Sequence, residues 1–328
     1  MSLLFGSLRA GVKVEKWHGA RNDFIFAEAG PFLDSLQNAR DEASVAKVAI
    51  ELCHRATGLG ADGLVLWMNV PNGGVCAAIW NSDGSRAGTC GNALRCLAAL
   101  CLANKIWSGT GELPVHNMSI RDAGPVSEDT VFARLQESGL EQTPENHFRS
   151  QVEMGRVIKV QPISLSALNN AAFIGGTVAQ EILLSALHGV TFVELANPHL
   201  VLSLKPNSFR KFSNDHFVEL GTLLQTETIC QTLNIPLSNI GFVELPNEDQ
   251  IQAGQPLNAI VYERGAGLTQ CCGSGGCAMK VALDNSKSSR VGKPESFSMP
   301  GGVITISVKN EALQLAGPAQ RVCRMSLD

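Results

Sequence analysis

Short apolar runs alternate with amphipathic stretches along most of this 328-residue chain. Three runs, at 24–30, 62–68 and 75–81, are rich in β-branched and aromatic residues and are bounded by Gly, Asn or Asp. This pattern predicts strands. Two longer stretches, at 41–58 and 91–105, carry Ala, Val, Ile and Leu at helical spacing. They predict helices.

The same alternation resumes in the second half of the chain. Strands are predicted at 199–204, 241–245 and 257–265, and helices near 215–234 and at 275–285. Strands and helices that alternate in this way indicate a mixed fold of the α/β (α+β) class.

The middle of the chain reads differently. Residues 108–150 are turn-rich and polar, and VFARLQ at 131–136 is the only clear strand there. A chain of 328 residues more often forms two domains than one. We therefore expect a domain boundary in this region.

The composition is that of a globular protein, with 45% hydrophobic and 17% charged residues. A formal charge of −4 gives no electrostatic reason to expect nucleic acid or an anionic membrane as a partner. No apolar run approaches the roughly 20 residues that span a bilayer, and the first residues do not have the pattern of a signal peptide. We expect a cytoplasmic protein.

Ten cysteines are present, but none forms a C-x-x-C pair, so the spacing typical of a zinc ribbon is missing. A cytoplasmic chain is expected to keep these thiols reduced. Most of them are expected to be small buried apolar residues.

Two of the cysteines belong to an internal repeat. The segments NSDGSRAGTCGNALRC at 81–96 and ERGAGLTQCCGSGGC at 263–277 share one layout: a polar residue, a loop with glycine, and Cys-Gly at the start of a predicted helix. Nine positions separate Asn81 from Cys90, and nine separate Glu263 from Cys272. This predicts two copies of one structural unit that face each other across a cleft.

The predicted helix starts give Cys90 and Cys272 a chemical role. The first N–H groups of a helix lack partners and carry partial positive charge. A thiol at that position has a lowered pKa. The same N–H groups can hold a carboxylate, and glycine lets the ligand approach the backbone. This cradle is predicted at Gly91, Asn92, Gly273 and Ser274.

Two thiols on opposite sides of one bound carboxylate suit inversion of the neighbouring stereocentre. One thiolate removes the α-proton, and the other thiol delivers a proton to the opposite face. Buried cysteines at tight turns, or a redox disulfide, would explain either motif alone, whereas the matched spacing favours acid–base catalysis. Cys271 has no counterpart in the first motif and is expected to pack behind the loop.

From about residue 13 to its end, the chain resembles the diaminopimelate epimerase family, which belongs to the pyridoxal-phosphate-independent amino-acid racemases. The shared motifs, in chain order, are WHGARNDF, GLGADG, WNSDGSRAGTCGNALRC, ANPH, NIGFVEL, YERGAGLTQCCGSGGCA and MPGG…LAGPA. The resemblance implies two similar, pseudo-symmetric domains with the active site between them. We place them at 1–125, to which 318–328 returns, and at 126–317.

The resemblance also implies roles for individual residues. Cys90 and Cys272 become the two acid–base residues, and His199 and Glu263 the residues that tune the thiol pKa values. The residues implied to bind substrate are Asn22, Asn81, Gly91, Asn92, Asn197, Asn239, Glu263, Arg264, Gly273 and Ser274. Taken singly, each asparagine is more typical of a turn or cap, and His199 of a loop histidine with satisfied hydrogen bonds. Arg264 is the most informative, because a planar guanidinium binds a carboxylate through two hydrogen bonds.

Three positions depart from the family pattern. Gly63 stands where some members have a substrate-contacting glutamine, Leu268 replaces a usual glutamate, and Arg21 replaces a frequent glycine.

The implied activity is an isomerase that interconverts LL- and meso-diaminopimelate in lysine and peptidoglycan-precursor synthesis, without a cofactor or a metal. The implied partner is this small molecule alone, and the family further implies a homodimer. One alternative is a racemase for another amino acid, such as proline or histidine. A second is a catalytically silent protein that keeps the cleft as a ligand-sensing module.

Overall fold

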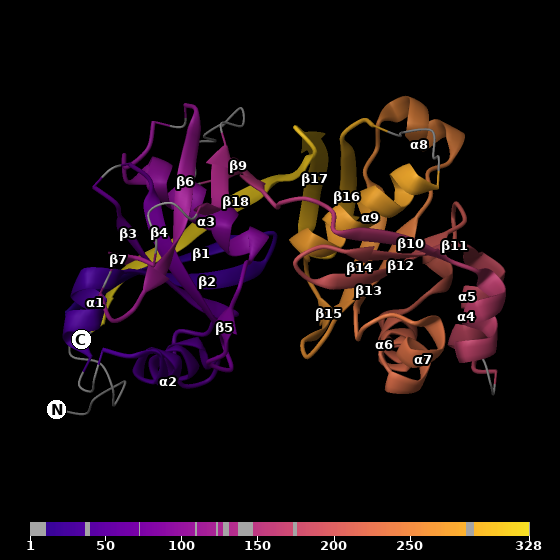
Figure 1. Ribbon diagram of the computed structural model, residues 1–328, viewed down its shortest axis with the longest axis horizontal. Coiled ribbons are helices and arrows are strands. Elements are labelled where there is room, and N and C mark those ends of the chain that lie inside the picture. Colours follow the sequence, from indigo (N-terminus) through magenta and orange to yellow (C-terminus); the bar gives the residue numbers. More distant parts are fainter. Residues whose placement is uncertain are drawn as a thin grey trace. The chain divides into compact units, whose positions relative to one another are not determined.

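The computed structural model describes residues 11–36, 40–71, 73–108, 110–122, 124–126, 131–136, 147–172, 176–286 and 292–327. The chain divides into two compact units, each described here by itself (Figure 1). The first comprises Met1–Glu153 and Ala316–Asp328, and the second Met154–Leu315.

The first unit is built from strands and three α-helices in its described part. Its elements are β1 (Val12–Gly19), β2 (Asn22–Glu28), α1 (Ala29–Ser35), α2 (Glu42–Cys53), β3 (Gly63–Asn69), β4 (Val75–Asn81), β5 (Arg86–Ala87), α3 (Gly91–Ala103), β6 (Glu112–Ser119), β7 (Gly124–Pro125), β8 (Val131–Gln136), β9 (His147–Glu153) and the distal part of β18 (Ala312–Leu327).

The second unit has more helices on its surface. Its elements are β10 (Lys159–Ile163), α4 (Leu165–Ala172), α5 (Val178–Ala186), β11 (Leu187–Glu194), β12 (Pro198–Leu204), a 3₁₀ turn (Phe209–Lys211), α6 (Asn214–Leu224), α7 (Glu227–Leu233), β13 (Asn239–Glu244), α8 (Glu248–Ala253), β14 (Leu257–Glu263), β15 (Gly267–Thr269), α9 (Gly273–Asn285), β16 (Glu295–Met299) and β17 (Gly302–Lys309).

Both units use one plan of strand pairing. In the first, β18, β1 and β2 are antiparallel neighbours, β3 joins β2 in parallel, β4 joins β3 antiparallel, and β6 joins β4 in parallel. In the second, β10, β11 and β12 are antiparallel, β13 joins β12 in parallel, β14 joins β13 antiparallel, and β16 joins β14 in parallel. The prediction of two similar units of mixed α/β structure is therefore confirmed.

The correspondence holds residue by residue around the two cysteines. Strand β4 and helix α3 start at Val75 and Gly91, and β14 and α9 start at Leu257 and Gly273, each 182 positions later. A short antiparallel strand folds back onto β4 at Ile79–Ala87 and onto β14 at Val261–Thr269, again 182 positions apart. The two segments that repeat in sequence therefore also pair their strands in the same register.

A long helix is buried in each unit because most of its residues are apolar or glycine. In α3 the eleven residues from Gly91 to Cys101 are all buried, and the helix packs against β1, β8 and β9. Helices α1 and α2 join a separate apolar cluster on the other face of the sheet. In the second unit α9 packs on β11–β13, and α6 and α7 lie on the opposite side of these strands (Figure 1).

The elements predicted from sequence lie within a few residues of the observed ones, with two exceptions. The helix predicted near 215–234 is two helices, α6 and α7. The prediction that 131–136 is the only strand of 108–150 is wrong, because β6, β7 and the start of β9 also lie there. The sequence of β6 is polar and contains a proline, so its pattern does not predict a strand. Residues 127–130 and 137–146 of this region, and 287–291 of the later loop, lie outside the described residues.

The first unit extends past residue 125, where the sequence analysis placed the boundary. The reason is that β8 pairs with β6 and β9 pairs with β8, which ties these strands to the first sheet. None of the described helices is long and apolar enough to cross a bilayer.

Candidate active site

In the first unit, Cys90 is the N-cap residue of α3, with extended backbone (φ −131°) and a partly exposed side chain. Gly91 and Asn92 form the first turn and are buried. Their N–H groups belong to the first residues of a helix, where no carbonyl of the helix is available to accept them. The Cys90 thiol and the N–H groups predicted to bind an anion thus share one helix end.

The first turn of α3 is held by a buried arginine that the sequence analysis did not single out. Arg95 has no exposed surface and donates hydrogen bonds to Asn92 Oδ1 (2.5 Å) and to the carbonyl of Pro318 (2.7 Å). A Cβ on Gly19 would lie 3.1 Å from the Asn92 carbonyl oxygen, so only glycine fits easily there. A single arginine inside the apolar run GNALRCLAAL was the signal that could have revealed it.

Asn22 and Asn81 lie at the same edge of the first sheet. Asn22 starts β2 opposite Gly19, and Asn81 ends β4 opposite Gly63 of β3. Asn81 Nδ2 donates to Ser85 Oγ (2.9 Å). Asn22 Oδ1 is buried and has no hydrogen-bond partner. Because Gly19 also contacts the start of α3, this edge lies beside the helix end that carries Cys90.

In the second unit, Cys272 is the N-cap residue of α9, and its side chain is 5% exposed. Its Sγ accepts a hydrogen bond from the Gly275 N–H and lies 3.4 Å from Ser274 Oγ. Gly275 must be glycine, because a Cβ would approach Val261 to 2.7 Å. Cys271 is buried at 1% exposure.

The pKa of the Cys272 thiol is raised, contrary to the lowered value expected from its helix position. Burial raises this pKa first, and the carboxylate of Glu263 raises it further, while the contacts with Ser274 and Gly275 lower it only in part. Glu263 ends β14, and its Oε1 accepts a hydrogen bond from Thr269 Oγ1 (2.6 Å). Burial and Glu263 therefore favour the protonated thiol of Cys272.

His199 is fully buried on β12, and neither of its ring nitrogens has a hydrogen-bond partner. Burial lowers the pKa of the imidazole to about 4. The ring is neutral at neutral pH. Both of its nitrogens remain able to form a hydrogen bond with another group. The satisfied loop histidine considered from sequence is not what the structure shows.

The remaining residues of the second unit that were predicted to bind substrate lie together at one end of its sheet. His199 lies beside Asn239 in the parallel pair β12–β13, and Asn197 lies two residues before His199. Asn239 Oδ1 accepts a hydrogen bond from the Arg264 N–H (2.8 Å). The Arg264 side chain is exposed, and its contact with the Leu237 carbonyl is long, at 3.5 Å, so the guanidinium is available to a ligand.

The strand register relates the two groups of residues. Phe24 pairs with Gly63, just as His199 pairs with Asn239, so Asn22 corresponds to Asn197. Asn81 and Glu263 correspond in the same way, as do the two cysteines. Each unit therefore presents one asparagine, one strand-end polar residue and one N-cap cysteine at equivalent places.

The three departures from the family pattern have local explanations. Arg21 has a positive φ of 66° in the β1–β2 turn, a region that favours glycine. Leu268 packs against the apolar core of the second unit, which accounts for an apolar residue there. A side chain at Gly63 would meet the Trp80 carbonyl at 2.5 Å, so this position offers only its backbone.

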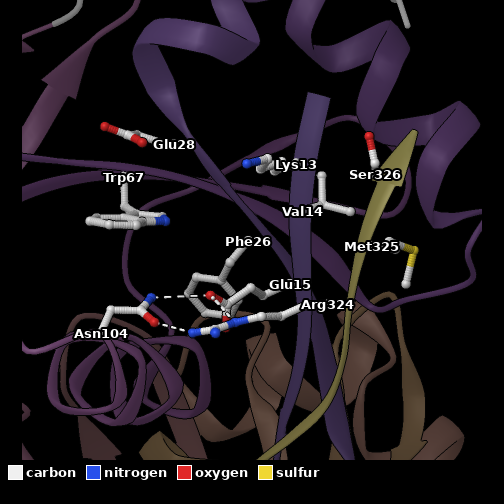
Figure 2. A pocket seen from close by; sticks show the side chains of 10 residues that line it. All are labelled: Lys13, Val14, Glu15, Phe26, Glu28, Trp67, Asn104, Arg324, Met325 and Ser326. Atoms are coloured by element: carbon white, nitrogen blue, oxygen red, sulfur yellow. Dashed lines mark hydrogen bonds and ion pairs between the residues drawn. The ribbon is translucent and has the colours of Figure 1, made fainter. Parts of the chain in front are cut away.

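A cavity of about 650 Å³ lies elsewhere in the first unit (Figure 2). Asn104, the C-cap residue of α3, lines it together with Glu15 and Arg324, and these three side chains are hydrogen-bonded to one another. A 13-residue helix spans about 20 Å, and Cys90 is at its other end. This cavity is not the site of the predicted thiol chemistry. Within the described residues, no group of three or more His, Cys, Asp or Glu is placed to hold a metal ion.

We predict that His199 makes stability depend on pH. Its pKa is about 4 in the folded chain and near 6.5 when unfolded, so the unfolded state binds more protons between these values. The free energy of unfolding should fall by about 3 kcal/mol from this group alone as pH drops through that window. His199→Phe, which copies Phe24 of the first unit, should remove this part of the slope in urea unfolding.

The control for this comparison is His188→Gln, which replaces an exposed histidine of the same unit. This variant should keep the fall in stability that His199 causes as pH drops. Equal slopes for wild type and His199→Phe would contradict the burial of a neutral imidazole.

Comparison with known proteins agrees with the geometry. The family model for diaminopimelate epimerase matches residues 14–160. The chain is 29% identical over 322 residues to the diaminopimelate epimerase of Natranaerobius thermophilus, which covers 95% of this chain and 96% of that protein. It is 26% identical over 312 residues to that of Bacillus licheniformis, at 94% and 95% coverage.

A solved structure, the phenazine biosynthesis protein of the PhzF family from Bacillus anthracis, superposes with a TM-score of 0.65. That alignment covers 98% of this chain and all of the other at 11% identity, which is a likeness of fold alone. The sequence relatives extend over both units and share the name of the matching family model. Along nearly its whole length, the chain is similar to diaminopimelate epimerases.

Proposed function

We propose that this protein is an isomerase that interconverts LL- and meso-2,6-diaminopimelate by proton transfer at the α-carbon. The observation that carries the proposal is the pair of N-cap cysteines, Cys90 and Cys272, at equivalent positions of two buried helices. The similarity to curated diaminopimelate epimerases over about 95% of the chain supports the same substrate.

The reaction needs one thiolate and one thiol at its start. The thiolate takes the α-proton as the C–H bond breaks, and the electron pair is delocalised into the neighbouring carboxylate. The other cysteine then gives its proton to the opposite face of the carbon, so that one thiolate and one thiol remain. Burial and Glu263 raise the pKa of Cys272, which favours the thiol form of this residue before the substrate binds.

Helix N-termini stabilise the charge that develops during this step. The N–H groups of Gly91 and Asn92, and of Gly273 and Ser274, would hold the reacting carboxylate, where negative charge grows as the proton leaves. Donors that are already aligned by a rigid helix need no rearrangement at that moment. In the first turn of α3, Arg95 supplies that rigidity through Asn92.

The remaining polar residues suit a substrate with charged groups at both ends. The exposed guanidinium of Arg264 would bind the distal carboxylate. Asn22 Oδ1, buried and without a donor, would accept a hydrogen bond from an ammonium group, and Asn81, Asn197 and Asn239 would complete the set. His199 and Glu263 would adjust the proton affinities of the thiols.

The proposal includes the arrangement inferred from the family. The two units would act as N- and C-terminal epimerase domains that close around the substrate, with no cofactor. The protein would work in the cytoplasm, where thiols stay reduced, in lysine and peptidoglycan-precursor synthesis, and as a homodimer.

Purified, reduced protein should convert LL-diaminopimelate to the meso isomer, followed by chiral chromatography. Cys90→Ala and Cys272→Ala should each lower kcat by about 10³-fold, because each removes a general acid or base. Cys101→Ala, which alters a buried cysteine farther along α3, is the matched control and should stay active. No turnover of diaminopimelate, with turnover of proline or histidine, would instead indicate the alternative racemase. Ligand binding without any turnover would indicate the silent sensor.

The role of the Arg264 side chain gives a second prediction. Arg264→Ala should lower kcat/KM for diaminopimelate by about 100-fold, the order expected for the loss of a charge-assisted pair. The far-ultraviolet circular dichroism should not change, because this side chain is exposed. Arg210→Ala, at another exposed arginine of the second unit, should leave kcat/KM near the wild-type value. A folded Arg264→Ala variant with full activity would refute the assignment.

A further inference from the structure

Four charged side chains form a network at the edge of the first sheet. Asp23 pairs with Lys16 (Nζ–Oδ2, 2.9 Å) and with Arg55 (Nη2–Oδ1, 2.9 Å). Arg55 Nη2 also pairs with Asp62 Oδ1 at 2.7 Å. Lys16 further donates to the carbonyls of Leu59 and Gly60. One guanidinium thus bridges a carboxylate on β2 and one directly before the neighbouring strand β3.

The backbone of the same residues is cross-linked. The Asp62 N–H donates to the Asp23 carbonyl (2.8 Å), and the Asp23 N–H donates to Asp62 Oδ2 (3.0 Å). The Ser82 N–H donates to the Asp62 carbonyl (3.0 Å). Asp23, Asp62 and Ser82 are the direct neighbours of Asn22, Gly63 and Asn81, so the network fixes the backbone at three positions of the candidate site.

The second copy of the unit shows that the fold does not require these charges. By strand register, Lys16, Asp23 and Asp62 correspond to Phe192, Pro198 and Ser238. Those residues are uncharged, yet the strands keep the same pairing and the same order. The network is therefore an addition to one half of the molecule, placed beside the residues proposed to bind substrate.

Electrostatics shows why Arg55 is the key member. Burial raises the pKa of the Asp23 carboxyl, but hydrogen bonds from Arg55 and Lys16 outweigh burial and hold this pKa below its usual value. Burial, and in addition the nearby Asp23, raise the pKa of Asp62. Two carboxylates at this separation repel each other, and the bridging guanidinium offsets that repulsion.

We propose that Lys16, Asp23, Arg55 and Asp62 are positioning residues that hold Asn22 and Asn81 in the geometry that binds the substrate. This inference rests on the proposed function. Asn22 Oδ1 is a buried acceptor without a donor, which costs free energy while it waits for a ligand. The rigid backbone that directly follows Asn22 keeps this acceptor from turning toward water.

The test is steady-state kinetics of Arg55→Ala with LL-diaminopimelate. Misplacement of the binding residues should raise KM by about tenfold, whereas kcat should change less than about threefold, because both thiols stay in place. Arg55→Lys should rescue little of the KM, since a single ammonium cannot bridge the two carboxylates in a planar arrangement. The matched control is Arg134→Ala, which breaks the exposed pair with Glu112 (3.4 Å) in the same unit and should leave KM unchanged.

The outcomes separate this inference from the proposed function. An active wild type with an unchanged KM in Arg55→Ala overturns the positioning role and leaves the proposed function intact. A wild type without turnover overturns both. In a third outcome, kcat falls only as far as urea unfolding shows a loss of folded protein, and KM is unchanged in the folded fraction and in Arg55→Lys. The network would then be purely structural, which also overturns the inference.

Discussion

A cysteine at the N-cap of a buried helix is the arrangement on which the rest of this structure depends. Helices α3 and α9 are apolar on nearly every side and lie inside their units, so their N-termini are fixed by the surrounding strands. This fixes the thiols of Cys90 and Cys272 and the N–H groups of the first helical turn that follows each of them. The proposed acid–base groups and anion-binding donors would then come from one rigid element in each unit, and catalysis by orientation needs such rigidity.

The two units place different side chains on this common frame. Where the first has Asn81, Phe24 and Gly63, the second has Glu263, His199 and Asn239. Glu263 helps to keep Cys272 protonated, whereas the first unit has a neutral amide at the equivalent place. The proposed two-base reaction starts with one thiol and one thiolate, and unequal charges at equivalent positions of the two units would favour this difference without a change of fold.

The sequence predicted what depends on local pattern. The strands β4 and β8 and the starts of the helices after Cys90 and Cys272 were located closely, because apolar periodicity and Cys-Gly spacing carry that information. It did not predict β6, whose strand character comes from pairing with β4 and β8. It also missed the raised pKa of Cys272, because desolvation by the packed fold and Glu263 outweighs the helix end. Arg95 and the network around Arg55 were missed because each arginine also binds a residue that is distant in sequence, Pro318 and Asp23 respectively.

The measurement that tests the two-cysteine account most directly is the early reaction of LL-diaminopimelate in heavy water, followed by mass spectrometry of both isomers. Each thiol exchanges its proton with solvent, and the two cysteines act on opposite faces. Proton transfer by two separate cysteines should therefore give meso product with one deuterium at the inverted α-carbon, while the remaining LL substrate carries almost none. Meso product without deuterium, or equal labelling of substrate and product from the start, would show a single shared base and contradict the account.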